Sequence, residues 1–429
     1  MAGIKCLDDG WADLGSGGVR FTCCQTATYA IMYSLKNDVV VGSSSAMRDV
    51  PVIPLFTVSM PPKAELLPAL ERTLWSGYIG QGPRVDEFET RLVEYFGNRN
   101  VLTVNSGTSA IQLALRLIGV HGGEVITTPM TCTATNMPIL AEGGRVVWAD
   151  VDPASGNIDP ADVEQKITRD TRAILCVHWG GNPCDMAELG RIGAKYGTPV
   201  VEDAAHAWGA EYNGRRIGSG TADCTCFSLQ AIKHITTVDG GVLLCRNTDH
   251  YRRGKLLRWY GIDREANRKD FRCEEDIAEW GHKWHMNDVA ATIGLVQMGH
   301  IDRIVAAHRA HALTYDQELG IPAAAALPVA LGSYWLYTLL LPSHPARLAF
   351  MQHMRSQGVM TSQVHARNDT HTCFRLFQRS PLPGVDEFAA RMVCVPVHAA
   401  LTEAEVGQVI AACRSFESPI VARRKVLAQ

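Results

Sequence analysis

Short apolar runs alternate with amphipathic stretches along residues 50–300 of the chain. Phe88, Leu92 and Phe96 recur at helical spacing, and the same spacing appears in several other stretches. Helices are predicted at residues 64–75, 86–96, 160–167 and 186–196, and another after the turn at 105–109, with Ala110, Ala114, Leu117 and Ile118 on one face. Strands are predicted at residues 101–104, 125–127, 145–148, 173–177, 199–202 and 241–245. This alternation requires crossover connections, so it predicts an α/β fold with a mostly parallel sheet between helices.

The pattern changes beyond residue 300. It predicts a helix at residues 301–319, a strand at 335–341, a helix at 345–357 and a strand at 392–397. The sequence Thr402-Glu403-Ala404-Glu405 has the capping-box signature of a last helix. We therefore expect a large α/β domain at residues 50–299 and a smaller α+β domain at residues 300–429. Residues 1–49 are rich in Gly and Ser without a clear period, and are predicted to form a poorly ordered extension.

Composition narrows the function classes. The 429 residues, 46% of them hydrophobic, can bury a large core, and the formal charge of -3 gives no electrostatic case for nucleic acid. No apolar run reaches the roughly 18 residues that a membrane-spanning helix needs, so no membrane partner is expected. The 13 cysteines lack the spacing of a disulfide-stapled module or a zinc site. A reduced, cytoplasmic protein without a bound metal is the expectation.

Two residues indicate a specific chemistry. Asp203 ends an apolar strand, and Lys233 lies in a polar, glycine-bounded turn after a later strand. The carboxyl ends of parallel strands gather ligand groups at one edge of a sheet. An aldehyde cofactor with a pyridine ring needs an amine that forms an imine and a carboxylate that keeps the ring nitrogen protonated. Each residue alone has an ordinary alternative, a solvated lysine or a helix-capping aspartate, but together they predict a pyridoxal 5'-phosphate (PLP) enzyme.

A phosphate site is predicted before these residues. The turn Ser106-Gly107-Thr108-Ser109 links a strand to a helix, whose first N–H groups attract an anion. Gly107 would let the phosphate approach closely and Thr108 could donate from its hydroxyl, although ordinary helix capping explains the turn equally well by itself. Ser228 is a second candidate phosphate contact. His206 would face the cofactor ring or its phenolic oxygen.

The order of these motifs resembles the DegT/DnrJ/StrS group of sugar aminotransferases, which are fold-type-I PLP enzymes. The resemblance covers roughly residues 54–410. It rests on Gly80-Gln81-Gly82-Pro83, Asn105-Ser106-Gly107-Thr108-Ser109-Ala110, Glu124-Val125-Ile126, Val201-Glu202-Asp203-Ala204-Ala205-His206, Phe227-Ser228-Leu229-Gln230-Ala231-Ile232-Lys233 and Gly281-His282-Lys283-Trp284-His285-Met286-Asn287-Asp288.

The resemblance implies roles and a reaction. Lys233 would be the catalytic Schiff-base lysine, Asp203 the partner of the pyridine nitrogen, and Gly107, Thr108 and Ser228 the phosphate cradle. L-glutamate would donate the amino group, pyridoxamine 5'-phosphate would be the intermediate, and a keto sugar would accept the group in a ping-pong reaction. A nucleotide-linked 4-keto-6-deoxyhexose is the expected acceptor. The family's dehydratase branch has His in place of this lysine, so Lys233 favours transamination.

Some expectations depart from the family pattern. Cys132 stands where relatives place an aromatic residue that stacks on the cofactor, so either His206 would take over that role or the stacking would be weaker. The family works as a homodimer with shared active sites, and residues 283–287 would complete the neighbouring site. His285 occupies a position where relatives often carry Asn or Arg. His365 and Arg367 are predicted to bind a diphosphate or carboxylate of the acceptor, with a merely solubilising pair as the alternative.

Three other functions stay open at this stage. The acceptor could be a keto-sugar acid without a nucleotide. The chain could instead be a non-catalytic PLP-binding sensor or regulator, although such a protein has no need of an imine-forming amine. The third possible function is that of a fold-type-I enzyme acting on amino acids, such as a desulfurase or lyase.

Overall fold

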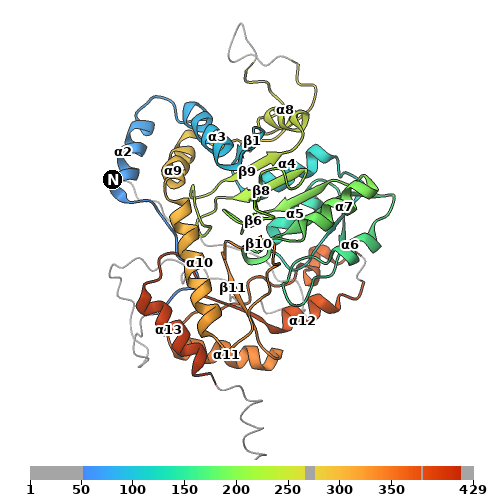
Figure 1. Ribbon diagram of the computed structural model, residues 1–429. Coiled ribbons are helices and arrows are strands. Elements are labelled where there is room, and N and C mark those ends of the chain that lie inside the picture. The colour runs from blue at the N-terminus through green and yellow to red at the C-terminus, as the bar shows by residue number, and fades with distance from the viewer. Residues whose placement is uncertain (1–51, 266–275, 378–379, 417–429) are drawn as a thin grey trace, which may run out of the picture. The chain divides into compact units, whose positions relative to one another are not determined.

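A seven-stranded sheet forms the centre of the computed structural model, which describes residues 52–265, 276–377 and 380–416 (Figure 1). The strand order is β1-β9-β8-β5-β4-β2-β3. The strands are β1 (Val101–Val104), β2 (Glu124–Thr127), β3 (Arg145–Trp148), β4 (Thr171–Val177), β5 (Val200–Asp203), β8 (Cys224–Ser228) and β9 (Gly241–Cys245). β9 is antiparallel to both of its neighbours, whereas the other pairings are parallel. The predicted α/β class with a mostly parallel sheet is confirmed.

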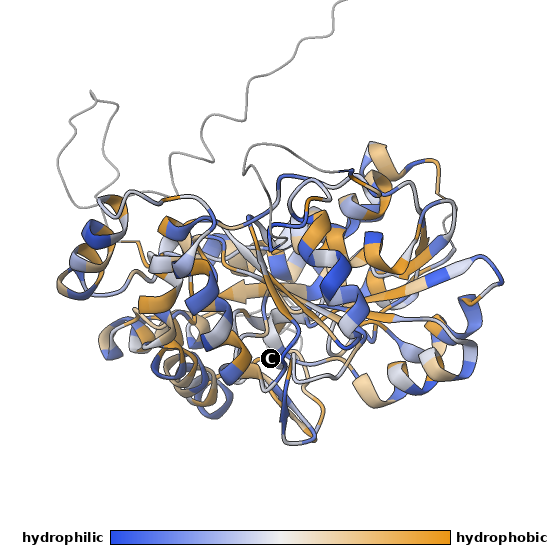
Figure 2. Cartoon of the chain, turned by 90° about the horizontal axis from the view of Figure 1, so that it is seen from above, coloured by the Kyte–Doolittle hydropathy of each residue, from blue (hydrophilic) through white to orange (hydrophobic). Residues whose placement is uncertain are grey.

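Both faces of this sheet are buried, which explains why its strands are almost continuously apolar. Leu175 and Val201 belong to the hydrophobic cluster on one face, and Ile174 and Val200 to the cluster on the other. The first cluster includes side chains of α4 (Gly107–Ile118) and α5 (Thr133–Ala141). The second includes side chains of α3 (Pro83–Phe96) and α7 (Met186–Tyr196). Figure 2 shows the apolar strands enclosed between helices whose polar positions face outward.

The start of α3 differs from the prediction. It begins at Pro83 rather than at residue 86. The carboxylate of Asp288 accepts hydrogen bonds from the backbone N–H groups of Gly82 (2.8 Å) and Val85 (3.1 Å). Asp288 therefore caps this helix from a segment distant in sequence, and the local pattern of α3 carries no sign of that cap.

Several elements were not predicted. The strand expected before the lysine turn is present as β8, for which the sequence analysis gave no bounds. The missed helices are α8 (Thr248–Leu257), α9 (Asp288–Met298) and α12 (Pro383–Arg391), together with α5. The missed strands β6 (Glu211–Tyr212), β7 (Arg215–Arg216) and β10 (Ala330–Leu331) form a three-stranded sheet and are too short to show a period. The predicted helices 64–75 and 160–167 correspond to α2 (Lys63–Leu74) and α6 (Pro160–Lys166).

The C-terminal region forms a third apolar cluster around the antiparallel pair β11 (Tyr337–Leu340) and β12 (Met392–Val395). Side chains of α10 (Ile301–Glu318), α11 (His344–Ser356) and α13 (Glu403–Arg414) complete it. The capping box of Thr402 and Glu405 is confirmed at the start of α13. The division into domains at residues 50–299 and 300–429 stays a prediction, and the extension at residues 1–49 lies outside the described residues.

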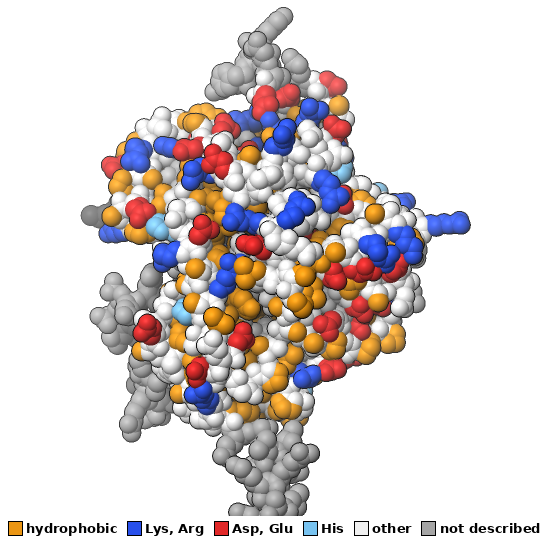
Figure 3. Space-filling model, in the orientation of Figure 1, with side chains coloured by type: hydrophobic (Ala, Val, Ile, Leu, Met, Phe, Trp, Pro, Cys, Tyr) orange, Lys and Arg blue, Asp and Glu red, His pale blue; other side chains and the backbone are white. Residues whose placement is uncertain are grey.

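The surface carries mixed charge. Acidic and basic side chains are interspersed over the face seen in Figure 3, with hydrophobic atoms between them. None of the helices within the described ranges is both long enough and apolar enough to cross a membrane.

Candidate active site

The sheet brings the two central predicted residues to the same edge. β5 and β8 are adjacent and parallel, with Asp203 paired to Cys226, so their carboxyl ends meet. Asp203 is the last residue of β5, and Lys233 lies in the loop that follows β8. The negative charge of Asp203 acts on the Lys233 amine and opposes the fall of its pKa. Asp203 and Lys233, which are 30 residues apart in the sequence, thus lie at the same edge of the sheet.

The amine of Lys233 lies against an aromatic ring instead of a carboxylate. Its Nζ is 3.6 Å from the centroid of the Trp335 ring, and it makes no hydrogen bond among the described residues. Burial lowers the pKa of Lys233 from 10.5 to about 8, with the charges of Cys132 and Asp203 acting in the opposite direction. An amine in this range is partly neutral near physiological pH and therefore nucleophilic.

Asp203 is held by donors that fix its orientation. The residue is 5% exposed. Its Oδ2 accepts a hydrogen bond from the Thr135 hydroxyl at 2.6 Å, and its Oδ1 accepts from the backbone N–H of Ala205 at 3.0 Å. The Thr135 hydroxyl lies 2.7 Å from that of Thr131. Sequence reasoning missed Thr135. It lies in the first turn of α5, the helix that follows β2, and this position was the one feature that pointed to the site.

Two buried imidazoles lie near the lysine. The His206 ring stacks on Trp335 with centroids 4.0 Å apart, and the His365 ring is 5.9 Å from that of His206. Burial and the charge of Lys233 lower the pKa of both, to about 3 for His365, so both rings are neutral. Nδ1 of His206 and Nε2 of His365 are buried and lack a partner in the described part of the chain. These two nitrogens are available to a bound molecule.

The predicted phosphate turn faces Ser228. Ser106 caps α4 by accepting a hydrogen bond from the N–H of Ser109 at 3.0 Å. A Cβ added to Gly107 would lie 2.8 Å from the Cβ of Ser228, so only glycine fits between this turn and the end of β8. Thr108 follows in the first turn of α4, whose free N–H groups suit an anion.

These residues fit pyridoxal phosphate. The described residues offer a half-buried amine without a hydrogen-bonding partner, a fixed carboxylate, a helix N-terminus that a Cβ would obstruct, and two imidazole nitrogens without partners. Cys132, the residue preceding α5, acts electrostatically on Lys233 and lies at the same edge of the sheet. His206 is already stacked on Trp335, which is a contact that the sequence did not indicate.

The loop at residues 364–369 is tied to the cofactor side of the sheet by Asn368. Asn368 is fully buried, and its backbone N–H donates to the carbonyl of Pro129 at 2.8 Å. Its Nδ2 donates to the carbonyl of Thr131 at 2.8 Å, and its Oδ1 accepts from Nδ2 of Asn136 at 2.9 Å. This anchor holds His365 close to the lysine. Sequence reasoning passed over Asn368, because its partners come from a distant part of the chain.

Arg367 is engaged by carboxylates of the protein. Its Nε and one terminal nitrogen donate to Asp369, each at 2.8 Å, and its other terminal nitrogen pairs with Asp386. These hydrogen bonds, that of Asp369 first, raise the pKa of the guanidinium. A role of Arg367 in substrate binding stays a prediction.

His285 lies apart from the lysine. It forms a β-bridge with Val104 at the end of β1, and its ring is 3.7 Å from that of Trp259. Burial, and then the charge of Arg264, lower its pKa to about 4. Within the described residues His285 thus contacts β1 and Trp259, and its contribution to a neighbouring subunit stays a prediction.

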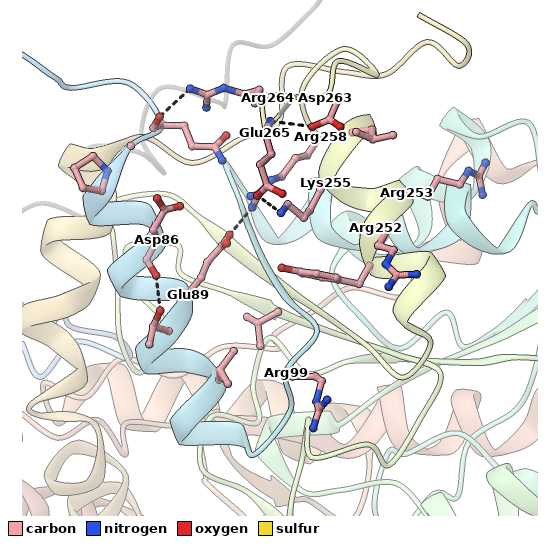
Figure 4. Close-up of a pocket in the computed structure, with 18 of the residues that line it drawn as sticks. Asp86, Glu89, Arg99, Arg252, Arg253, Lys255, Arg258, Asp263, Arg264 and Glu265 are labelled. Atoms are coloured by element: carbon pink, nitrogen blue, oxygen red, sulfur yellow. Dashed lines mark hydrogen bonds and ion pairs between the residues drawn. The ribbon is translucent and has the colours of Figure 1, made fainter. Parts of the chain in front are cut away.

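A cavity of about 1160 Å³ lies between α3 and α8, and none of the predicted site residues line it (Figure 4). Two of its charged residues bond to the edge strand of the sheet. Glu89 accepts a hydrogen bond from the N–H of Thr103 at 2.7 Å, and Arg258 donates to the Thr103 carbonyl at 2.9 Å and pairs with Glu89. These contacts satisfy backbone groups of β1, so Glu89 and Arg258 have a structural role.

Comparisons with known proteins show the family and the fold. The sequence model of the DegT/DnrJ/EryC1/StrS aminotransferase family matches residues 62–414. The crystal structure of AtS13 from Actinomadura melliaura is 42% identical, covers 86% of this chain and 100% of that chain, and has a TM-score of 0.81. The sugar aminotransferase CalS13 from Micromonospora echinospora is 38% identical, with a TM-score of 0.80. The match covers 85% of this chain and 100% of that chain. Spr1654 from Streptococcus pneumoniae, in its PLP form, is 26% identical, covers 85% and 98%, and has a TM-score of 0.77; its PMP form is also known.

Proposed function

Because the chain belongs to the DegT/DnrJ/EryC1/StrS aminotransferase family, we propose that it moves the amino group of L-glutamate to a keto sugar, with PLP bound to Lys233. The observation that carries the proposal is that the half-buried amine of Lys233 and the fixed carboxylate of Asp203 lie at one edge of the sheet and interact electrostatically. A protein that only binds a ligand needs no such amine.

The proposed cofactor contacts follow from the site. Lys233 binds the aldehyde, Asp203 pairs with the pyridine nitrogen, and Gly107, Thr108 and Ser228 hold the phosphate. Cys132 and His206 lie beside the ring. When bound, the cofactor supplies an electron sink that stabilises negative charge at the α-carbon of the donor.

The protein then supplies proton transfer and a fixed electrostatic setting. Once the amine of glutamate has displaced Lys233 from the aldehyde, the freed Nζ would accept the proton from the α-carbon of glutamate, and a free amine with a pKa of about 8 is partly neutral near pH 7. The hydroxyl of Thr135 keeps Asp203 in one orientation and stabilises its charge. His206 and His365 are neutral, so they can form hydrogen bonds to the substrate without adding positive charge beside the lysine.

The proposed acceptor is a nucleotide-linked 4-keto-6-deoxyhexose. Support comes from the sugar aminotransferases among similar structures and from His365, which Asn368 holds near the amine. Arg367 would bind the diphosphate by exchanging its exposed partner Asp386. We further propose a homodimer in which residues 283–287, including His285, complete the neighbouring site.

Absorbance spectra of the purified protein test this proposal. The wild type should show the visible band of lysine-bound cofactor, and L-glutamate should abolish it. Lys233→Ala should lack both the band and turnover, whereas Lys63→Ala, at an exposed helix start, should keep both. Normal turnover of Lys233→Ala would contradict the assignment. A protein that keeps its band in glutamate would be a sensor if no other amino acid changes the band, and an enzyme acting on amino acids if one does.

A panel of keto sugars tests the acceptor. Glutamate-treated protein should regain the band with a nucleotide-linked 4-keto-6-deoxyhexose and show little response to keto-sugar acids that carry no nucleotide. The reverse pattern would overturn the nucleotide linkage but leave the aminotransferase reaction in place.

A further inference from the structure

Trp335 contacts the candidate lysine at two separate points. Its indole Nε1–H donates a hydrogen bond of 2.8 Å to the carbonyl of Ile232, the residue before Lys233. Its ring lies 3.6 Å from the Lys233 amine. The side chain is 3% exposed and is also stacked against His206 and Phe56, at 4.0 and 4.8 Å between centroids. One rigid side chain thus touches both the backbone and the amine of the lysine segment.

An aromatic ring suits a lysine that must react. A long lysine side chain has many rotamers, and holding its amine in one place requires a partner. A carboxylate partner would stabilise the ammonium strongly and so disfavour the neutral, nucleophilic form. An aromatic face attracts the ammonium more weakly and cannot accept its proton. Trp335 can therefore restrain Lys233 while leaving its proton free to move.

Several charged or titratable groups also act on Lys233, and none of them replaces this contact. Asp203 and Cys132 act on the amine electrostatically, and Lys233 in turn influences His206, His234 and His365. His234 Nε2 is committed to the carbonyl of Ser333 at 3.0 Å. Asp203 is committed to Thr135 and Ala205.

We propose that Trp335 is a positioning residue that fixes the Lys233 amine for bond formation with the cofactor and for proton transfer. The inference rests on the proposed role of Lys233. Trp335 lies just before β11, so it also links the C-terminal region of the chain to the lysine loop. It acts through Lys233 and need not touch the substrate.

Two substitutions separate the contacts. Trp335→Leu removes the hydrogen bond and the ring face, and is expected to slow formation of the lysine–cofactor bond and to lower kcat by about 10- to 100-fold. Trp335→Phe keeps a ring face and loses only the N–H donor, so it should recover most of that rate. KM for glutamate should change little in either variant.

Stopped-flow absorbance of the full-length, cofactor-free protein mixed with PLP gives the rate of bond formation independently of turnover. Trp179→Phe is the matched control, because Trp179 is 1% exposed and its Nε1 donates to the Thr338 hydroxyl at 3.2 Å, so this indole N–H, unlike that of Trp335, does not bond to the lysine loop. It should react at the wild-type rate. If Trp335→Leu does not fold, the comparison of Trp335→Phe with Trp179→Phe decides, and only the former should be slower.

Three outcomes would overturn the inference. The first is a Trp335→Leu variant that reacts at the wild-type rate. The second is equal loss in Trp335→Phe and Trp179→Phe, because the effect would then follow stability alone. The third is a wild type that forms no lysine–cofactor bond, and only this result would also overturn the proposed function.

Discussion

Replacement of Lys233 by Met should stabilise the cofactor-free protein at neutral pH. Burial lowers the pKa of Lys233 from 10.5 to about 8, so keeping the lysine charged in the folded state lowers the free energy of unfolding. At 1.36 kcal/mol for each pKa unit, the cost is about 3 kcal/mol at most. The residue is partly accessible, and we therefore expect a gain of about 1–3 kcal/mol at pH 7. Met keeps the length of the side chain and a favourable sulfur contact with Trp335.

The pH dependence gives the sign of the effect. Below pH 8 the lysine is protonated in both the folded and the unfolded protein, and the full loss of stability is present. Between pH 8 and 10.5 only the unfolded state binds the proton, so the stability of the wild type rises with pH. The advantage of Lys233→Met should therefore shrink steadily over this range and vanish above it.

Urea unfolding followed by tryptophan fluorescence measures this difference. Both cofactor-free proteins are compared at each pH from 7 to about 10, so that the titration of other groups cancels. Lys63→Met controls for the loss of an exposed lysine. A variant less stable than the wild type at pH 7, or an advantage that is the same at pH 7 and 10, would refute the reasoning.

Three further substitutions test other parts of the site. Asp203→Asn should lower the rate of the glutamate half-reaction by about 100-fold or more, because the charge beside the ring nitrogen is lost; a rate within a few-fold of the wild type would contradict this role. Thr135→Val should lower that rate by about 10-fold in a protein with unchanged circular dichroism, since buried Oδ2 of Asp203 loses its donor. Gly107→Ala should weaken PLP binding by at least about 10-fold in a fluorescence titration, because the new Cβ would meet Ser228 at 2.8 Å. Gly190→Ala, in open space on α7, should leave PLP binding unchanged.

The sequence predicted the helices and strands in which apolar residues recur at regular spacing. It also predicted that Asp203 and Lys233 lie at the edge of the sheet. β1, β3, β9 and α7 match their predicted bounds, because apolar spacing decides them locally. Asp203 and Lys233 could be paired in advance because parallel strands place their carboxyl ends together. The family match was likewise available from the motifs, and the structure and comparisons confirm the fold and the aminotransferase class.

The missed parts depend on contacts between distant segments. Thr135 meets Asp203, Asn368 meets Pro129, and Trp335 meets the loop of Lys233 only after the chain has folded. Thr and Asn are common in turns and caps, and Trp335 reads as an ordinary apolar residue at the start of a strand. No local pattern distinguishes these side chains from structural ones.

Borohydride reduction followed by peptide mass spectrometry tests the central claim most directly, because it locates the residue that carries the cofactor. The account predicts that the pyridoxyl group is found on the peptide that contains Lys233, and that prior treatment with L-glutamate prevents the labelling. A label on another lysine, or a cofactor that is bound without any covalent label, would contradict it.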